Sequence, residues 1–207
     1  MKMSKNTLSS ILVFFCILTI VFSFNSCSKD FFPRAPEDDL VTDELQKPTG
    51  IEEDDSQIIS FGDVIPSLKK VVTVNKKINA NKGGSLSLEH EIKTRTGKVE
   101  VEMMLTIKPN ALSKNTKIKM RLDTKKAIFI FNPDGTQFST PAIFDVKVSG
   151  LKLTSSTGRK IDIYYYNEDT GEWEKVKREA VIVDDTRGLI IVKGAQLPHF
   201  SRYALSK

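Results

Sequence analysis

Cysteine and histidine are scarce in this chain, since its 207 residues include only two of each. So few thiol and imidazole groups argue against a multi-ligand zinc site, an iron–sulfur cluster or a disulfide scaffold. The sequence also lacks a Gly-x-Ser-x-Gly elbow and a His-Glu-x-x-His motif, which mark serine hydrolases and zinc proteases. We therefore expect no metal site and no cofactor, and we expect that the protein is not an enzyme.

Charge is distributed unevenly along the chain, although the net value is only +5. Residues 28–60 contain 10 acidic and 3 basic residues, whereas residues 61–207 contain 26 basic and 16 acidic residues. A basic body can attract nucleic acid, but no RNA-binding aromatic signature accompanies these lysines, which alternate with apolar residues. We expect no nucleic-acid partner and attribute the lysines to solubility and protection of strand edges.

The first 26 residues are typical of a bacterial lipoprotein signal peptide. Lys2 and Lys5 precede an apolar run of 14 residues, Ile11–Phe24, which is short for a membrane-spanning helix of about 20 residues. Ser26 directly before Cys27 resembles a lipobox, in which the cysteine is acylated and becomes the new N-terminus. We predict cleavage after residue 26 and lipidation at Cys27, so that membrane lipid is one partner. An uncleaved anchor and an ordinary signal peptide are the alternatives.

Residues 27–57 are predicted to form an acidic flexible tether. The segment contains three prolines and two acidic clusters, 37–39 and 52–55. It has too little apolar surface to fold alone, and its like charges favour extension. Its start, Cys27-Ser28-Lys29-Asp30, resembles a sequence that routes some Bacteroidota lipoproteins to the cell surface. We therefore expect an outer-membrane or cell-surface protein in a bacterial envelope.

Residues 58–207 are predicted to form an all-β domain. Apolar and polar residues alternate with a period of two at 99–107, 118–123, 144–149 and 161–165, which indicates strands with one buried face. Two further runs, 128–131 and 189–192, are apolar on both faces, as in central strands. Turn sequences at 132–135, 167–171 and 184–188 separate these runs. Short strands without intervening amphipathic helices predict an antiparallel β-sandwich.

The second half of the chain also resembles a known family from about residue 83. Ile107–Leu112 resembles a signature of the ZU-five-type domain, a β-sandwich of zona occludens proteins, netrin receptors and ankyrins. Phe131–Ala142 resembles a second stretch of that family, and Gly171–Trp173 and Pro198–Tyr203 resemble the tail of bacterial lipoproteins that carry the module. The resemblance implies a protein-interaction or structural module and no defined reaction.

The same resemblance draws attention to His199-Phe200-Ser201. Some animal relatives cleave themselves between the Phe and the Ser of such a motif. By resemblance, Ser201 would attack the Phe200 carbonyl while His199 assists proton transfer, which requires a strained peptide and a nearby base. In a regular strand His199 and Ser201 lie about 6.6–6.8 Å apart, too far for a direct hydrogen bond. We expect instead a final core strand with Phe200 packed on one face.

Aromatic residues around one predicted hairpin offer a candidate ligand-binding surface. Tyr164 and Tyr166 point away from Tyr165 in a strand, so they form an exposed pair if Tyr165 is in the core. Such a pair beside basic groups can stack a sugar or anchor a partner protein. The alternative is cross-strand packing that stabilises the hairpin. Trp173 is predicted to lie in the core.

These patterns predict a lipid-anchored envelope protein that presents a β-sandwich for binding or scaffolding, with an envelope protein or a glycan as its partner. Two alternatives remain open: a self-cleaving sandwich that acts at Phe200–Ser201, and a carbohydrate-binding module that uses Tyr164 and Tyr166.

Overall fold

The computed structural model describes residues 40–41, 55–64, 70–153 and 160–207. All of them belong to one compact unit, Phe32–Lys207. The predicted signal peptide (1–26), Cys27 and most of the predicted tether (27–57) lie outside the described residues.

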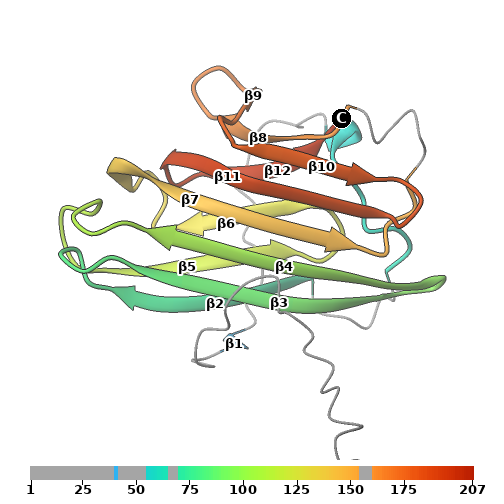
Figure 1. Ribbon diagram of the computed structural model, residues 1–207, viewed down its shortest axis with the longest axis horizontal. Helices are drawn as coiled ribbons and strands as arrows, with labels where there is room; N and C mark the ends of the chain where they lie inside the picture. Colours follow the sequence, from blue (N-terminus) through green and yellow to red (C-terminus); the bar gives the residue numbers. More distant parts are fainter. Residues whose placement is uncertain (1–39, 42–54, 65–69, 154–159) are drawn as a thin grey trace, which may run out of the picture. The chain divides into compact units, whose positions relative to one another are not determined.

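The described chain is an antiparallel β-sandwich, as the alternating sequence patterns predict (Figure 1). One sheet has seven strands in the order β1-β2-β5-β6-β12-β8-β9. Their bounds are β1 Leu40–Val41, β2 Val71–Ile78, β5 Thr116–Asp123, β6 Ile128–Asn132, β12 Arg202–Ser206, β8 Asp162–Asn167 and β9 Glu172–Lys175. The other sheet has five strands in the order β10-β11-β7-β4-β3. Their bounds are β10 Ala180–Asp184, β11 Leu189–His199, β7 Gln137–Ser149, β4 Gly97–Ile107 and β3 Gly84–Thr94. A short 3-10 helix, η1 Asp55–Gln57, precedes β2.

Strand β4 shows how the period-two pattern builds the core. Val99, Val101, Met103, Leu105 and Ile107 are all buried, whereas the residues between them are exposed or half-buried. The same alternation appears in β5 and β7. One face of each sheet is therefore apolar and packs against the other sheet in a single continuous core.

The runs that are apolar on both faces are internal strands, as predicted. β6 lies between β5 and β12, and β11 lies between β10 and β7. Phe131 of β6 meets Phe144 of β7 edge-on, with ring centroids 5.1 Å apart. Because β6 and β7 belong to different sheets, this ring pair joins the two layers.

Several short connections carry the chain from one sheet to the other, and two of them contain motifs singled out in the sequence. The turn after Asn132 leads from β6 in the seven-stranded sheet to β7 in the five-stranded sheet. Phe200 and Ser201 lead back from β11 to β12. In the part of the chain that the structure describes, no helix is long and apolar enough to span a membrane.

Candidate functional site

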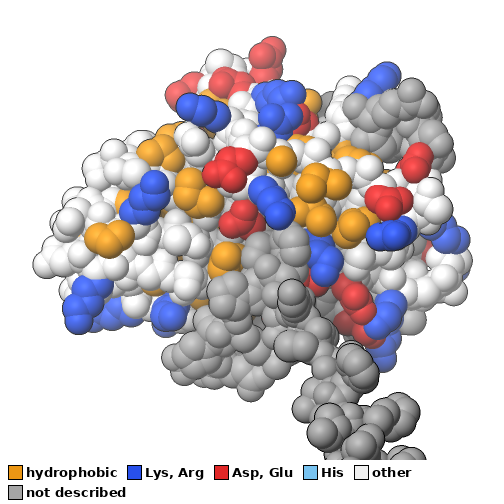
Figure 2. Space-filling model, viewed as in Figure 1, with side chains coloured by type: hydrophobic (Ala, Val, Ile, Leu, Met, Phe, Trp, Pro, Cys, Tyr) orange, Lys and Arg blue, Asp and Glu red, His pale blue; other side chains and the backbone are white. Residues whose placement is uncertain are grey.

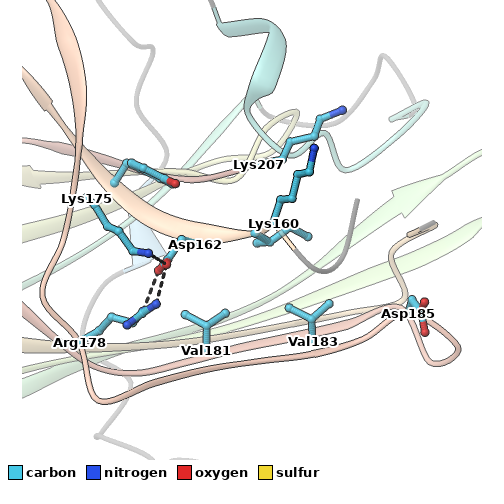
Figure 3. A pocket seen from close by; sticks show the side chains of 10 residues that line it. Lys160, Asp162, Lys175, Arg178, Val181, Val183, Asp185 and Lys207 are labelled. Carbon is cyan, nitrogen blue, oxygen red and sulfur yellow. Dashed lines mark hydrogen bonds and ion pairs between the residues drawn. The ribbon is translucent and has the colours of Figure 1, made fainter. Parts of the chain in front are cut away.

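A groove of about 950 Å³ opens where the two sheets separate at one edge of the sandwich (Figure 3). Strand β9 pairs with β8 only from Tyr164 to Asn167, so the first two residues of β8, Asp162 and Ile163, extend beyond it. The chain then crosses to β10 in the other sheet. One wall of the groove consequently carries residues of β8 and β9, and the other wall carries β10.

Asp162, at the start of β8, is the centre of an ion-pair network in this groove. Its carboxylate accepts hydrogen bonds from Arg178 Nε at 2.7 Å and Arg178 Nη2 at 2.6 Å, and Lys175 Nζ lies 2.6 Å away. Burial alone would raise the pKa of the Asp162 carboxyl, but the hydrogen bonds from Arg178 and Lys175 outweigh it and lower the pKa. The carboxylate therefore stays ionised and fixes both cations on this wall.

The opposite wall is apolar. Val181 and Val183 of β10 point into the groove (Figure 3), are half-buried and pack against the core. Lys160 and Lys207 also line the groove, and their side chains lie on the side of it away from Val181 and Val183 (Figure 3). The site thus combines an aliphatic surface with several cationic groups, which suits an extended ligand with both apolar and acidic groups.

The expected exposed pair of tyrosines does not form. Tyr164 is half-buried and lines the groove, but Tyr166 is only 7% exposed. Both side chains do lie on the outer face of the seven-stranded sheet, as the period-two argument predicts. Tyr166 is nevertheless covered, because the ring of Trp173 lies 5.4 Å away and the guanidinium of Arg202 lies 4.7 Å above it.

Trp173 also lies elsewhere than the prediction placed it. It pairs with Tyr166 across β8 and β9, so its side chain is on the outer face of the sheet and not in the main core. There it packs, half-buried, against a small apolar cluster of Ile58, Ile128 and Ala204. The hairpin aromatics therefore pack mainly against one another and against Arg202, which is the cross-strand alternative weighed from the sequence.

In the motif His199-Phe200-Ser201, His199 is the last residue of β11, whereas Phe200 and Ser201 form the crossing between the two sheets rather than part of a final strand. Strand β11 ends at His199 and β12 begins at Arg202. The expectation of a strand is therefore wrong here, whereas the expected burial of Phe200 is confirmed, since it is 1% exposed. Its ring stacks on Phe131 and meets Phe138 edge-on, which anchors the crossing in the core.

The hydrogen bonds at this crossing do not align a nucleophile with the Phe200 carbonyl. Ser201 Oγ donates to the Tyr166 carbonyl at 3.2 Å, and His199 Nδ1 lies 3.4 Å from the Phe200 oxygen. Gly135 N–H donates to the same Phe200 oxygen at 3.1 Å. Within the described residues, Ser201 thus bonds to a backbone carbonyl and not to a base.

Sequence reasoning missed the groove, although it singled out Tyr164 on one wall. Asp162 and Arg178 are 16 positions apart, and no local pattern indicates that they meet. The alternating pattern predicts a solvent-facing position for Asp162, between Ile161 and Ile163. Its burial comes from the chain that crosses to β10, which the pattern does not indicate. Cys27 lies outside the described residues, among which no three His, Cys, Asp or Glu side chains gather as a metal site would require.

Comparisons with known proteins add no relative. The chain matches no model of a known protein family, and no curated protein matches it closely enough to count as a relative.

Proposed function

We propose that this chain is a lipid-anchored protein of a bacterial envelope, on the outer membrane or cell surface, which presents its β-sandwich for binding or scaffolding. It is not an enzyme in this proposal. The observation that carries the proposal is the N-terminal sequence, in which two lysines, the apolar run Ile11–Phe24 and Ser26 precede Cys27. Several acyl chains at about 0.8 kcal/mol per buried methylene would anchor the chain stably, with the acidic segment 28–57 as a spacer.

A binding role is supported by the chemistry of the described residues. The groove beside β10 offers cationic and apolar surface. Ser201, the residue that would act as nucleophile in self-cleavage, instead donates a hydrogen bond from its hydroxyl group to a backbone carbonyl. The resemblance to ZU-five-type domains agrees with an interaction module. The proposal therefore includes that the β-sandwich is a ZU-five-type domain.

The test is acylation of the full chain in a Gram-negative host fed an alkyne analogue of palmitate. We expect label on the wild-type protein in the membrane fraction and none on Cys27→Ser, because the thiol carries the lipid. Cys16→Ser is the matched control, since Cys16 lies inside the run removed with the signal peptide, and it should label like the wild type. Label that persists on Cys27→Ser, or soluble unlabelled protein that retains Met1, contradicts the proposal.

The intact mass of the same purified protein tests the alternative of self-cleavage. We expect one species that begins at acylated Cys27 and continues through Ser201 to Lys207, because Ser201 is not aligned with the Phe200 carbonyl. A species that ends at Phe200 in the wild type, and is absent from Ser201→Ala, would replace the binding role with autoproteolysis.

A further inference from the structure

Strand β10 is an edge strand with little of the protection that edge strands usually carry. It ends the five-stranded sheet, and β11 is its hydrogen-bonded neighbour among the described strands. Natural edges are commonly protected by lysine, proline, bulges or short length. The sequence of β10 is Ala-Val-Ile-Val-Asp, and its central Ile182 is 47% exposed. Ile182 is the one large hydrophobic side chain that is exposed in the described part of the chain.

Other edges of the sandwich are protected. At the opposite end of the same sheet, β3 exposes Glu89, Glu91 and Lys93. Strand β9, at an edge of the other sheet, has four residues, two of which are the exposed Glu172 and Lys175. A second strand would have to pair against charged side chains there. The contrast singles out β10 as the edge suited to accept another strand.

The two faces of β10 offer different surroundings to the side chains of an added strand. On the outer face, Ile182 lies opposite Ile191 of β11. Figure 2, viewed as in Figure 1, shows hydrophobic and charged side chains mixed over the face of the molecule on which β10 and β11 lie. On the inner face, Val181 and Val183 point into the groove (Figure 3). Because side chains alternate along a strand, an added strand would place one set beside Ile182 and the other set in the groove.

The charge of the groove selects the residues that would enter it. Among the described residues, its lining holds four cationic side chains, Lys160, Lys175, Arg178 and Lys207, and two carboxylates, Asp162 and Asp185. Acidic side chains on the added strand are attracted there and basic ones are repelled. A second copy of this chain would bring an equally cationic groove alongside the first. A glycan would find Tyr164 as the one aromatic side chain in the described lining of the groove, since Tyr166 is covered.

We propose that β10 binds an extended acidic segment of another protein by strand addition, with the segment's acidic side chains in the groove and its apolar side chains beside Ile182. The inference rests on the proposed function, because it names the class of partner for the binding module. The backbone groups of β10 provide affinity and the alternating pockets provide specificity.

The test uses the purified full chain in detergent and a fluorescent, end-capped peptide of alternating Glu and Val. We expect saturable binding by fluorescence anisotropy, together with slower amide hydrogen exchange within residues 180–184. The same peptide with alternate backbone amides methylated keeps its charge but cannot pair on that edge, and it should bind at least about tenfold more weakly. A Lys-Val peptide should not bind.

Substitutions on each face of β10 test the two halves of the site. Ile182→Lys adds the protection that other edges have, and Lys160→Glu reverses a charge of the groove. Each should weaken Glu-Val binding by about fivefold or more. Lys117→Glu is the matched control, because it reverses an exposed lysine of β5, in the other sheet, and should leave binding unchanged.

Several results would overturn the inference. Equal binding of the methylated peptide would mean that nonspecific charge attraction suffices. Binding unaffected by both Ile182→Lys and Lys160→Glu would place the peptide elsewhere. A dimer in size-exclusion chromatography that Ile182→Lys dissociates would make a second copy the occupant of β10. Displacement of the peptide by polygalacturonate, sensitive to the same substitutions, would make an acidic glycan the ligand.

Failure of this inference and failure of the proposed function are distinguishable. An acylated chain that does not bind the Glu-Val peptide contradicts strand addition alone. A chain that binds the peptide as described but carries no lipid on Cys27 contradicts the lipid anchor alone.

Discussion

Asp162 is a buried carboxylate whose two cationic partners approach it from different segments. Lys175 ends β9, and Arg178 lies on the crossing between β9 and β10. The ion pairs therefore connect β8, in one wall of the groove, to the segment that leads to β10 in the other wall. Removing the charge would leave Arg178, 27% exposed, and Lys175, 56% exposed, without their carboxylate. Their exposure moderates the cost that a fully buried pair would have.

We predict that Asp162→Asn lowers the free energy of unfolding by about 2 kcal/mol at neutral pH. Because the folded state lowers the Asp162 pKa below its ordinary value of 3.8, this contribution is fully present above that value and is lost as pH falls through the folded pKa. The gap between wild type and variant should therefore shrink when urea unfolding is repeated at about pH 2.5.

Asp185→Asn is the control for this comparison, since Asp185 lines the same groove but has no ion pair within the described residues. It should change the free energy of unfolding by less than about 0.5 kcal/mol. If Asp162→Asn lowers the free energy of unfolding by the same amount at about pH 2.5 as at neutral pH, then packing, and not the carboxylate charge, is responsible.

Residue-level predictions from sequence succeeded where one strand decides the outcome and failed where several segments meet. Period two correctly placed Tyr164 and Tyr166 on one face, but it could not show that Arg202, 36 positions later, covers Tyr166. The sequence prediction places Trp173 in the core, yet its register opposite Tyr166 places it on the outer face. Burial on an outer sheet face depends on which distant side chains lie above it, and no short motif encodes that.

At the scale of elements, the alternating and doubly apolar runs identified β4, β5, β6, β7, β8 and β11. Their patterns reflect burial on one or two faces, which is a property of the strand itself. The first two long strands, β2 and β3, were not singled out. In β2, Thr73 is buried on the outward side between Val72 and Val74, so the run does not alternate cleanly. Sheet order and the opening beside β10 depend on long-range pairing and could not be read from local pattern.

Two glycines in turns have the same backbone angle but different space for a side chain. Gly83, just before β3, and Gly135, between β6 and β7, both have φ of 67°. A Cβ on Gly135 would meet nothing within 4 Å, whereas a Cβ on Gly83 would collide with the Ile107 carbonyl oxygen and lie 2.7 Å from the Lys108 carbonyl carbon. Both positions require the left-handed region, but only Gly83 also requires the absence of a side chain.

We predict that Gly135→Ala lowers the free energy of unfolding by about 1 kcal/mol, the cost of a non-glycine residue in the left-handed region. Gly83→Ala should cost at least about 2 kcal/mol more, because backbone atoms at the start of the Ile107–Leu112 segment would have to move. Thermal or urea unfolding of both variants measures the difference. Equal losses of unfolding free energy would show that the turn before β3 accommodates the added methyl group without a further energetic penalty.

At the scale of the whole molecule, the two sheets share one core instead of forming separate ones. Phe129 and Phe131 of β6 pack on Phe144 of β7, with ring centroids 5.3 and 5.1 Å apart. The crossing at Phe200 adds a third link, since its ring stacks on Phe131 at 5.5 Å. Neither sheet can bury its inner face without the other, so we expect the described domain to unfold as a single cooperative unit.

Trp173, the chain's only tryptophan, reports on the seven-stranded sheet, whereas far-ultraviolet circular dichroism reports on both sheets. We predict that Phe144→Leu, a change in the five-stranded sheet, lowers the free energy of unfolding by about 1–2 kcal/mol and shifts both signals to the same new urea midpoint. Ile143→Val, one position away on the outer face, should shift them by less than about 0.5 kcal/mol. Separate midpoints for fluorescence and circular dichroism would mean that the sheets unfold independently, because coincident probes are the test of a two-state transition.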